Sequence, residues 1–233
     1  IVPTYNMETI YGVNCIKGEV HSLMTILRWS SRFVGSSNNL SASVDTVNTK
    51  HNTIISEFGE LSDNIKDVFD LHNLNCCVYL EPFCRLVISQ KASGPLTCAA
   101  LNSLSKFALY GFLSSDFPGA KQGVNMVAYA ISNCIFDETD KESDEIILMK
   151  LLELATMTFR SNSSGLLSVF NAWRMYETCL AIYGQKKSSK VLRSEAETCL
   201  RHLTLTTFGG IHDTFLNCSN EVITNTTPIK SQH

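Results

Sequence analysis

The chain has 233 residues, a net charge of −3 at pH 7 and a hydrophobic fraction of 44%. This length suits one domain, or one elongated array of helices, with a sizeable core. The slightly acidic balance, with a pI near 6.1, excludes a strongly basic nucleic-acid-binding module. No run of the sequence reaches the roughly 18 apolar residues that a membrane-spanning helix needs.

Helical periodicity dominates the first part of the chain. Apolar residues from Ile10 to Leu27 recur at i, i+3, i+4 and i+7, which predicts a helix that closes near Gly35. A loop rich in Ser, Asn and Thr is expected at about 36–52. A second amphipathic helix is expected over 54–69.

Proline and glycine then mark a helix start and a corner. Pro82 is predicted in the first turn of a helix over 78–90, where its missing N–H costs nothing. Gly94 and Pro95 are predicted to fix a sharp corner, with Ser93 as the candidate cap of a helix that runs to residue 110. These three structural roles, at Pro82, Gly94 and Pro95, follow from backbone chemistry alone.

The middle of the chain repeats this organisation. The break Phe117-Pro118-Gly119 precedes a helix that ends near Ile131, and an acidic stretch at 137–145 precedes another helix over 146–159. Acidic side chains at a helix start are stabilised by the exposed amides of the first turn. We expect the following residues to lie in the core: Leu104, Phe107, Leu148, Leu151 and Leu152.

Serines are predicted to begin the last two helices, and glycines are predicted to end them. A serine at 163 or 164 is expected to cap one helix, which ends at Gly184. A serine at 188 or 189 is expected to start the last helix, which ends at the glycine pair 209–210. The chain beyond that pair is polar and is predicted to be a linker or disordered tail.

Basic residues and cysteines give little sign of a binding site. The basic cluster at 186–193 is interpreted as a solvated helix start, and a weak contact with anionic lipid headgroups is the alternative. The nine cysteines form no CxxC pair and no Cys/His cluster with zinc spacing, and they suit a reducing compartment. Because the chain begins at Ile1 without a signal-peptide pattern, we expect a cytoplasmic fragment of a longer protein.

The pattern predicts an all-α fold, an armadillo/HEAT-like helical solenoid of about eight helices with short connections and no strand. Residues 1–208 would form the helical domain, with its loop at about 36–52, and residues 209–233 would form the tail. A fold of this kind offers extended surfaces for other proteins.

No catalytic motif accompanies these helices. The sequence lacks the nucleophile elbow, the zinc-protease helix and the phosphate-binding loops of known enzymes. The acidic stretch lacks the central glycine and the final glutamate of an EF-hand. Phe170, Trp173 and Tyr176 share one helix stripe and are interpreted as core, and His202 as structural. We therefore expect a non-enzymatic chain with no metal and no cofactor.

Four segments carry a resemblance to a known family. They are KGEV with LMTILR at 17–28, YLEPFCRLVISQKASGPLTCAALNSLSKF at 79–107, CIFDETDKESDEIILMKLLEL at 134–154 and LRSEAETCLRHL at 192–203. In this order they resemble the N-terminal dimerisation and cyclophilin-binding (DCB) domain of large Arf guanine-nucleotide exchange factors. The closer branch is that of the Golgi brefeldin A-resistance factor, GNOM and Gea proteins. Lys141-Glu142 departs from the family's usual Pro-Ala.

The resemblance implies a regulatory module that contains no exchange domain. Such a module would form a homodimer and contact the homology-upstream (HUS) and exchange domains of its parent factor. It would act on an Arf-family GTPase indirectly, with peripheral recruitment to Golgi and early secretory membranes and no contact with nucleic acid. The competing interpretations are a generic armadillo/HEAT-like scaffold with an unrelated partner and a helical enzyme with an unrecognised site.

Two charged residues within the best-matching segments are candidates for the dimer or interdomain contact. Lys106 and Glu145 are predicted to lie near the self-association face, where they would pair across it. The alternative is that both are solvated helix positions.

Overall fold

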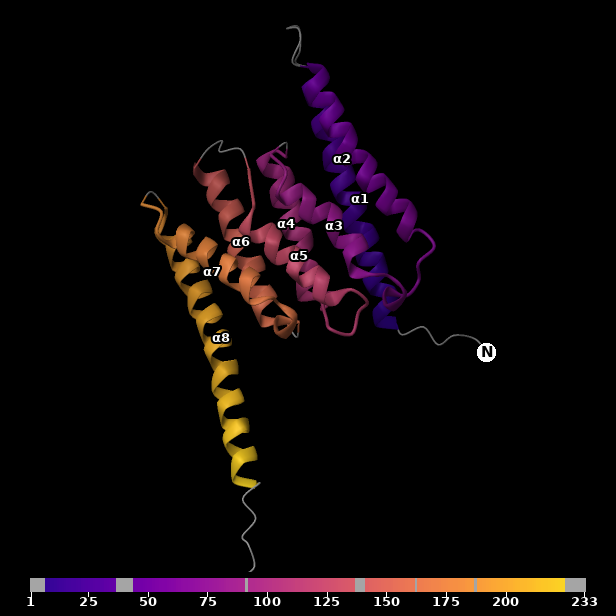
Figure 1. Cartoon of the computed structure of the whole chain (residues 1–233). Helices are drawn as coiled ribbons and strands as arrows, with labels where there is room; N and C mark the ends of the chain where they lie inside the picture. The colour runs from indigo at the N-terminus through magenta and orange to yellow at the C-terminus, as the bar shows by residue number, and fades with distance from the viewer. Residues whose placement is uncertain are drawn as a thin grey trace, which may run out of the picture.

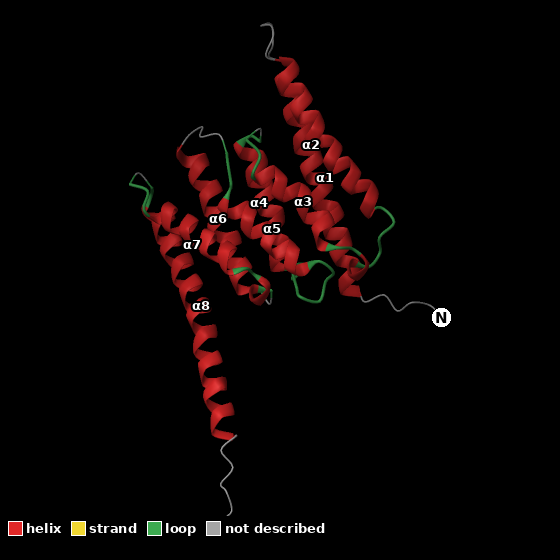
Figure 2. Cartoon of the chain, in the orientation of Figure 1, coloured by secondary structure: helices red, strands yellow, loops and turns green. Residues whose placement is uncertain are grey.

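A computed structural model describes residues 7–36, 44–90, 92–136, 141–161, 163–186 and 188–224. The described residues form α-helices and two short 3₁₀ turns, with no strand, which confirms the predicted all-α class (Figure 2). The helices are α1 (Met7–Ser36), α2 (Val44–Ile65), α3 (Cys76–Val87), α4 (Gly94–Leu109), α5 (Ala120–Ser132), α6 (Lys141–Arg160), α7 (Val169–Tyr183) and α8 (Lys190–Thr224).

The helices stack in two rows (Figure 1). In one row α1 contacts α4, α4 contacts α6 and α6 contacts α8. In the other row α2 contacts α3, α3 contacts α5 and α5 contacts α7. Consecutive helices such as α3 and α4 join the two rows. Each helix touches only its neighbours, which is the arrangement of a helical solenoid.

The core lies between the rows and is built by regular apolar stripes. In α1, Val13, Ile16, Val20, Leu23 and Leu27 follow a 3-4-3-4 spacing, and each is at most 2% exposed. A one-sided stripe of this kind stabilises a helix mainly through burial, at about 1.5–3 kcal/mol for each large side chain. Stripes of this kind on successive helices face one another, and together they form one continuous core.

An aromatic cluster fills the centre of this core. Phe83 packs edge-to-face on Phe58 and on Phe107, with ring centroids 5.1 Å and 5.3 Å apart. Tyr79 packs edge-to-face on Phe107 at 5.8 Å, and its hydroxyl donates a 2.6 Å hydrogen bond to the carbonyl of Phe112. Edge-to-face pairs add to the stabilisation from burial. The cluster joins α2, α3 and α4 where both rows meet.

The predicted corner at the start of α4 is confirmed. Ser93 is the residue before the helix, Gly94 begins it and Pro95 follows in the first turn. A Cβ on Gly94 would stand 3.2 Å from Cδ1 of Ile147 in α6. Gly94 therefore permits the close approach of α4 and α6, in addition to its place in the corner.

The predicted role of Pro82 as a helix start is wrong. α3 begins at Cys76, and Asn75 caps it by accepting a 2.9 Å hydrogen bond from the amide of Cys77. Pro82 therefore lies inside the helix. Its missing N–H leaves the carbonyl four residues earlier without a helical donor. That residue is Val78, on the partly exposed side of α3, where water is accessible.

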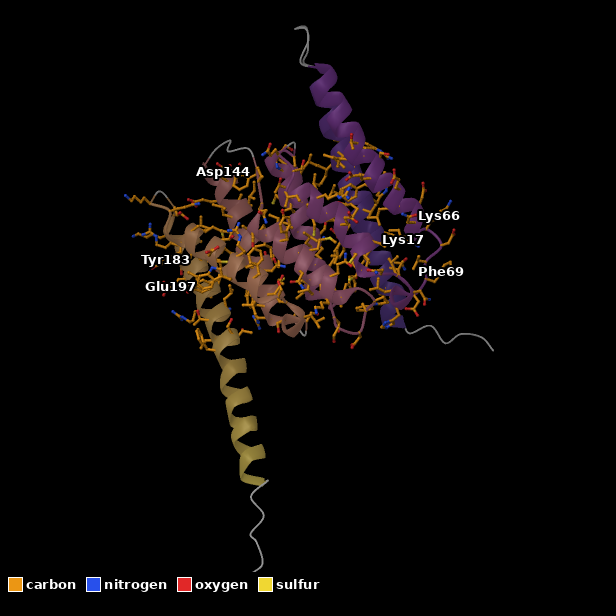
Figure 3. All side chains as sticks on the ribbon, viewed as in Figure 1. Lys17, Lys66, Phe69, Asp144, Tyr183 and Glu197 are labelled. Carbon is orange, nitrogen blue, oxygen red and sulfur yellow. The ribbon has the colours of Figure 1, made fainter. Side chains whose placement is uncertain are left out.

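The boundaries around α2 also differ from the prediction. The helix begins at Val44, inside the span 36–52 that was expected to be a loop, and it ends at Ile65 rather than near residue 69. The ammonium group of Lys17 donates to the carbonyls of Lys66 and Val68, at 2.9 Å and 3.3 Å, and lies 5.8 Å from the centre of the Phe69 ring (Figure 3). These contacts from α1 fix the chain just after α2.

α7 begins later than predicted. The serines at 163 and 164 belong to a 3₁₀ turn over Ser164–Leu166, and Ser168 caps the helix by accepting from the amide of Asn171. Asn125 of α5 fixes this turn. It accepts from the amide of Ser168 at 2.9 Å and donates to the carbonyl of Leu166 at 3.0 Å. Several serines could cap this helix on local sequence alone, and the contact with Asn125 determines that Ser168 does so. The predicted helix end at Gly184 is confirmed.

The last helix starts as predicted but does not end at the glycine pair. Ser189 caps α8 by accepting from the amide of Leu192 at 3.1 Å. The helix then continues to Thr224, past the other helices of the stack (Figure 1). Among the described glycines only Gly111 and Gly119 have a positive φ. Gly209 lacks the left-handed conformation that ends many helices, so it is an interior residue of α8.

Candidate interaction surfaces

Lys106 is part of a polar network between α1 and α4. Its ammonium group lies 2.6 Å from Oε1 of Glu19, and the hydroxyl of Ser103 donates to Oε2 of the same carboxylate at 2.8 Å. The hydrogen bond with Glu19 raises the pKa of Lys106 above its usual range. The network links neighbouring helices of one row within a single copy of the chain.

Glu145 has a different partner. Its Oε1 accepts a 2.8 Å hydrogen bond from the amide of Ser189, the residue before α8. A carboxylate at this position satisfies a free amide of the first turn and interacts favourably with the helix dipole. Glu145 therefore joins the start of α6 to the start of α8.

The structure does not bring Lys106 and Glu145 together. α4 and α6 run in the same direction, because Gly94 faces Ile147 near their starts and Leu109 lines one hollow with Arg160 near their ends. Lys106 lies near the end of α4, and Glu145 lies near the start of α6. A contact between them would have to join different copies, and that role stays a prediction.

The predicted core residues are buried, with one exception. Leu104, Phe107, Leu151 and Leu152 are at most 4% exposed, and Leu148 is half-buried against the core. The same stripe argument fails for α7. Phe170 is 71% exposed and Trp173 is 59% exposed, and only Tyr176 is partly buried. Their interpretation as core is therefore wrong for two of the three.

The exposed side of α7 carries a regular apolar seam. Val169, Trp173, Tyr176, Leu180 and Tyr183 follow a 4-3-4-3 spacing, which places them along one side of the helix. The buried residues Met175, Cys179 and Ile182 lie about a quarter to a third of a turn around the helix from this seam. The indole of Trp173 stacks near Tyr176, with centroids 6.0 Å apart, and its Nε1 donates to Glu177 at 2.8 Å.

Two other exposed aromatic side chains do not belong to this seam. Cys179 of α7 and Cys199 of α8 have their sulfur atoms 3.6 Å apart between the two helices. Phe170 precedes Cys179 by nine residues and Phe208 follows Cys199 by nine, which is half a revolution of a helix, so both rings point away from this contact. We call the five seam residues of α7 the terminal face: Val169, Trp173, Tyr176, Leu180 and Tyr183.

The terminal face is comparable to the largest apolar patches of monomeric proteins. Val169 is 87% exposed, Trp173 is 59% exposed and Leu180 is 48% exposed. With large side chains of ~150–250 Å² each, the accessible area of its five residues is on the order of 500 Å². The largest apolar patch of a typical monomer is ~300–600 Å² and often marks an interface. The 4-3-4-3 spacing could have indicated this face, but periodicity alone does not say which side of a helix is buried.

A surface hollow of about 460 Å³ lies where α4 and α6 end against α8. Glu153, Arg160 and Glu195 lie among its lining residues, together with Leu109 and Met157. No His or Cys side chain is among the lining residues, so the hollow lacks the groups that most nucleophile–base pairs of catalytic sites use. Among the described residues, no group of His, Cys, Asp or Glu side chains could hold a metal ion.

The described thiols behave as core side chains. Burial raises the pKa of Cys76 and of Cys134 to about 12, so both remain protonated and weakly nucleophilic at neutral pH. Within the same part of the chain, none of the helices is both long and apolar enough to span a membrane.

No model of a known protein family matches the chain. The Golgi-specific brefeldin A-resistance guanine nucleotide exchange factor 1 homolog of Caenorhabditis elegans is 29% identical over 83% of this chain and 10% of its own length. ARF guanine-nucleotide exchange factor 1 of Saccharomyces cerevisiae is 29% identical over 78% of this chain and 13% of its own length.

A plant relative agrees with these two. The ARF guanine-nucleotide exchange factor GNOM of Arabidopsis thaliana is 24% identical over 61% of this chain and 10% of its own length. The chain therefore spans about a tenth of the length of the curated relatives it matches. Over most of its length the chain is similar to Arf guanine-nucleotide exchange factors.

Proposed function

We propose that this chain is a non-catalytic regulatory and dimerisation module, of the DCB type, within an Arf guanine-nucleotide exchange factor. The module self-associates and contacts the HUS and exchange domains of its parent factor. Through them it influences exchange on an Arf-family GTPase at Golgi and early secretory membranes, to which the parent factor binds peripherally from the cytoplasm.

One observation carries this proposal. The chain matches exchange factors over most of its own length but covers only about a tenth of theirs. A short helical stack without a recognisable site for chemistry, among the described residues, fits a regulatory segment better than a catalytic one. The exposed terminal face supports a role in protein contacts, because an apolar surface of this size is costly to leave in water.

The first experiment measures mass and exchange together. Light scattering on the 233-residue chain is expected to give twice its 25.9 kDa mass at micromolar concentration. Release of a fluorescent nucleotide from an Arf GTPase is expected to stay at its uncatalysed rate when the chain is added. A chain that remains at 25.9 kDa at all concentrations would remove self-association from the proposal, and a catalysed release would remove the non-catalytic role.

A second experiment tests Lys106 and Glu145 as contact residues. Lys106→Glu and Glu145→Lys are each expected to lower the mass if these residues lie at the interface. Lys106→Glu also breaks the internal ion pair with Glu19. The double variant Glu19→Lys with Lys106→Glu restores that internal pair in reverse, and it is the matched control for folding.

The results separate the two roles of Lys106. If the interface uses this residue, the double variant stays at low mass because position 106 still carries the wrong charge. If the mass of the double variant returns to that of the unchanged chain, Lys106→Glu lowered the mass by disturbing the fold and not the interface. Unchanged mass in Lys106→Glu and in Glu145→Lys would exclude both residues from the interface.

A further inference from the structure

We propose that Cys179 of α7 and Cys199 of α8 are a modification site, at which a peroxide joins the two thiols in a reversible disulfide that fixes α7 to α8. Both thiols are free in the structure. The inference goes beyond the proposed function and does not depend on self-association, because the bond joins two helices of a single copy.

The two sulfur atoms are already in contact. They lie 3.6 Å apart between α7 and α8, and 20 positions separate the two cysteines in the sequence. A disulfide has its sulfur atoms about 2.05 Å apart, so the bond requires an approach of about 1.5 Å, shared between two side chains and two helices. Because α7 and α8 pack against each other (Figure 1), this approach leaves the arrangement of the stack unchanged.

Helix periodicity brings the two thiols together. Cys179 lies between Met175 and Ile182 on the buried side of α7, and Cys199 precedes Leu203 on the buried side of α8. Spacings of three and four residues keep side chains on one side of a helix. The position of each thiol is therefore fixed by a regular helix and its packing, and not by a loop.

The hydrogen bond between the thiols gives them different roles. The bond from Cys179 lowers the pKa of Cys199, and the same bond, together with burial, raises the pKa of Cys179. By contrast, burial raises the pKa of Cys76 to about 12. The thiolate is the nucleophilic form of cysteine. Cys199 is therefore the thiol that reacts with the oxidant, and Cys179 is the thiol that completes the disulfide.

The oxidation takes two steps and consumes one molecule of hydrogen peroxide. The Cys199 thiolate attacks one oxygen, so that an S–O bond forms, the O–O bond breaks and hydroxide leaves. The Cys179 sulfur then attacks the sulfenic acid of Cys199, the S–O bond breaks, and the departing hydroxide leaves as water with the proton of Cys179. In total, two thiols and one peroxide give one disulfide and two waters.

The position of the pair in the stack controls access to it. Both thiols are 1% exposed, so the oxidant reaches them when α7 separates from α8. These helices stand at one end of the rows among the described residues, where local opening costs less than unfolding of the centre. Once formed, the disulfide restricts that opening, because a cross-link removes freedom mainly from the open form.

Reduction makes the site reversible. A dithiol reductant of the cytoplasmic kind is oxidised to its own disulfide and returns Cys179 and Cys199 to two thiols. In a reducing compartment a disulfide is therefore transient. The bond would form during exposure to peroxide and disappear afterwards.

The test treats the folded 233-residue chain with hydrogen peroxide, alkylates the remaining thiols and analyses the digest by mass spectrometry. A peptide pair joined through Cys179 and Cys199 is expected, lighter than the two free peptides by two hydrogen atoms. A dithiol reductant is expected to separate the pair. Relative to Cys179→Ser treated in the same way, oxidation is expected to raise the midpoint of thermal unfolding by about 5 °C.

Serine variants separate the two roles. Treated Cys179→Ser is expected to hold a sulfenic acid at Cys199, which a cyclic diketone reagent traps. Treated Cys199→Ser is expected to give at least about tenfold less trapped product at Cys179, because the thiol there is protonated. Cys98→Ser in α4, a half-buried position, is the matched control and is expected to keep the disulfide. Circular dichroism checks that every variant remains folded.

Two outcomes would overturn the pairing. One is a folded chain in which Cys179 and Cys199 stay unlinked at a peroxide concentration that oxidises the half-buried Cys98. The other is preferential linkage of either cysteine to a third cysteine. A chain that forms the disulfide while remaining monomeric supports this inference and removes only the self-association proposed above.

Hydrogen exchange tests whether the bond fixes the helices. The oxidised chain is expected to exchange more slowly in α7 and α8 than the reduced chain, with α1 and α2 unchanged. Equal exchange in the two forms would overturn the fixing of α7 to α8.

Discussion

At the scale of single residues, the polar contacts decide how neighbouring helices are fixed in place. Glu19 receives hydrogen bonds from both Ser103 and Lys106, and only 16% of its side chain is exposed. Lys106 and Glu19 are 87 positions apart in the sequence. Sequence reasoning found Lys106 as a notable cation but could not find its partner, because that depends on how α1 packs on α4.

Glu19→Ala is expected to lower the free energy of unfolding by about 1–3 kcal/mol, because Lys106 loses its acceptor and Ser103 keeps only the backbone carbonyl four residues before it. Urea denaturation measures this as a lower midpoint with an unchanged slope. Glu81→Ala is the control, since Glu81 pairs with Arg85 on an exposed part of α3. An equal loss in both variants would contradict a special role for Glu19.

The same network predicts a dependence on pH. The folded state raises the pKa of Lys106 above its ordinary value of 10.5. The stabilisation is therefore fully present below pH 10.5, and it disappears as the pH rises through the folded value. Lys106→Met is expected to be less stable than the unchanged chain at pH 8 and equally stable once Lys106 is deprotonated. A constant difference across that range would contradict the prediction.

At the scale of helices, close approach depends on small residues that the sequence identifies only in part. The corner at Gly94 was predictable because proline follows it, whereas Gly123 lies inside α5 without a local signal. A Cβ on Gly123 would stand 2.6 Å from Sγ of Cys76 and 2.9 Å from Cδ1 of Leu80, both in α3. This glycine sets the distance between α3 and α5.

Gly123→Ala is expected to destabilise the chain by about 1–3 kcal/mol, because the added methyl group forces α3 and α5 apart. Gly18→Ala is the matched control. Gly18 lies in α1, and a Cβ there would meet nothing within 4 Å. The control is expected to stabilise the chain by about 0.5–1 kcal/mol through the better helix propensity of alanine. Thermal unfolding of both variants measures the difference, and the same sign in both would contradict it.

The sequence predicted which segments form helices, but it predicted the ends and the exposed sides of those helices less well. Apolar stripes predicted the helices at α1, α5 and α6, since periodicity is a local property. The start of α2 was missed because its first residues are rich in Asn and Thr. The end of α8 was misplaced because glycine permits a helix to end without requiring it. The exposed side of α7 depends on which helices surround it.

At the scale of the whole molecule, stability is expected to vary along the stack. In a solenoid, each helix is stabilised by its own sequence and by its neighbours. α7 and α8 stand at one end of their rows among the described residues, so fewer helices support them than support α3 and α4. The terminal pair should therefore open before the centre does.

Met175→Ala tests this uneven stability. Met175 is fully buried on the inner side of α7, so its truncation leaves a cavity that costs about 2–5 kcal/mol. Hydrogen exchange is expected to rise in α7 and α8 and to change little in α1 and α2. Equal increases in all helices would show that the stack unfolds as one unit. Cys98→Ala in α4, a half-buried position, is the control with a smaller expected effect.

The two-row arrangement also determines how far a local structural change is transmitted along the stack. Because α1 touches α4, α4 touches α6 and α6 touches α8, a small change of tilt at one contact is passed to the next helix in line. Successive tilts of the same sense add together, so a slight rotation of α1 would swing the far end of the row through a wider arc. A molecule contacting the first helices could in this way reorient whatever the last helices hold.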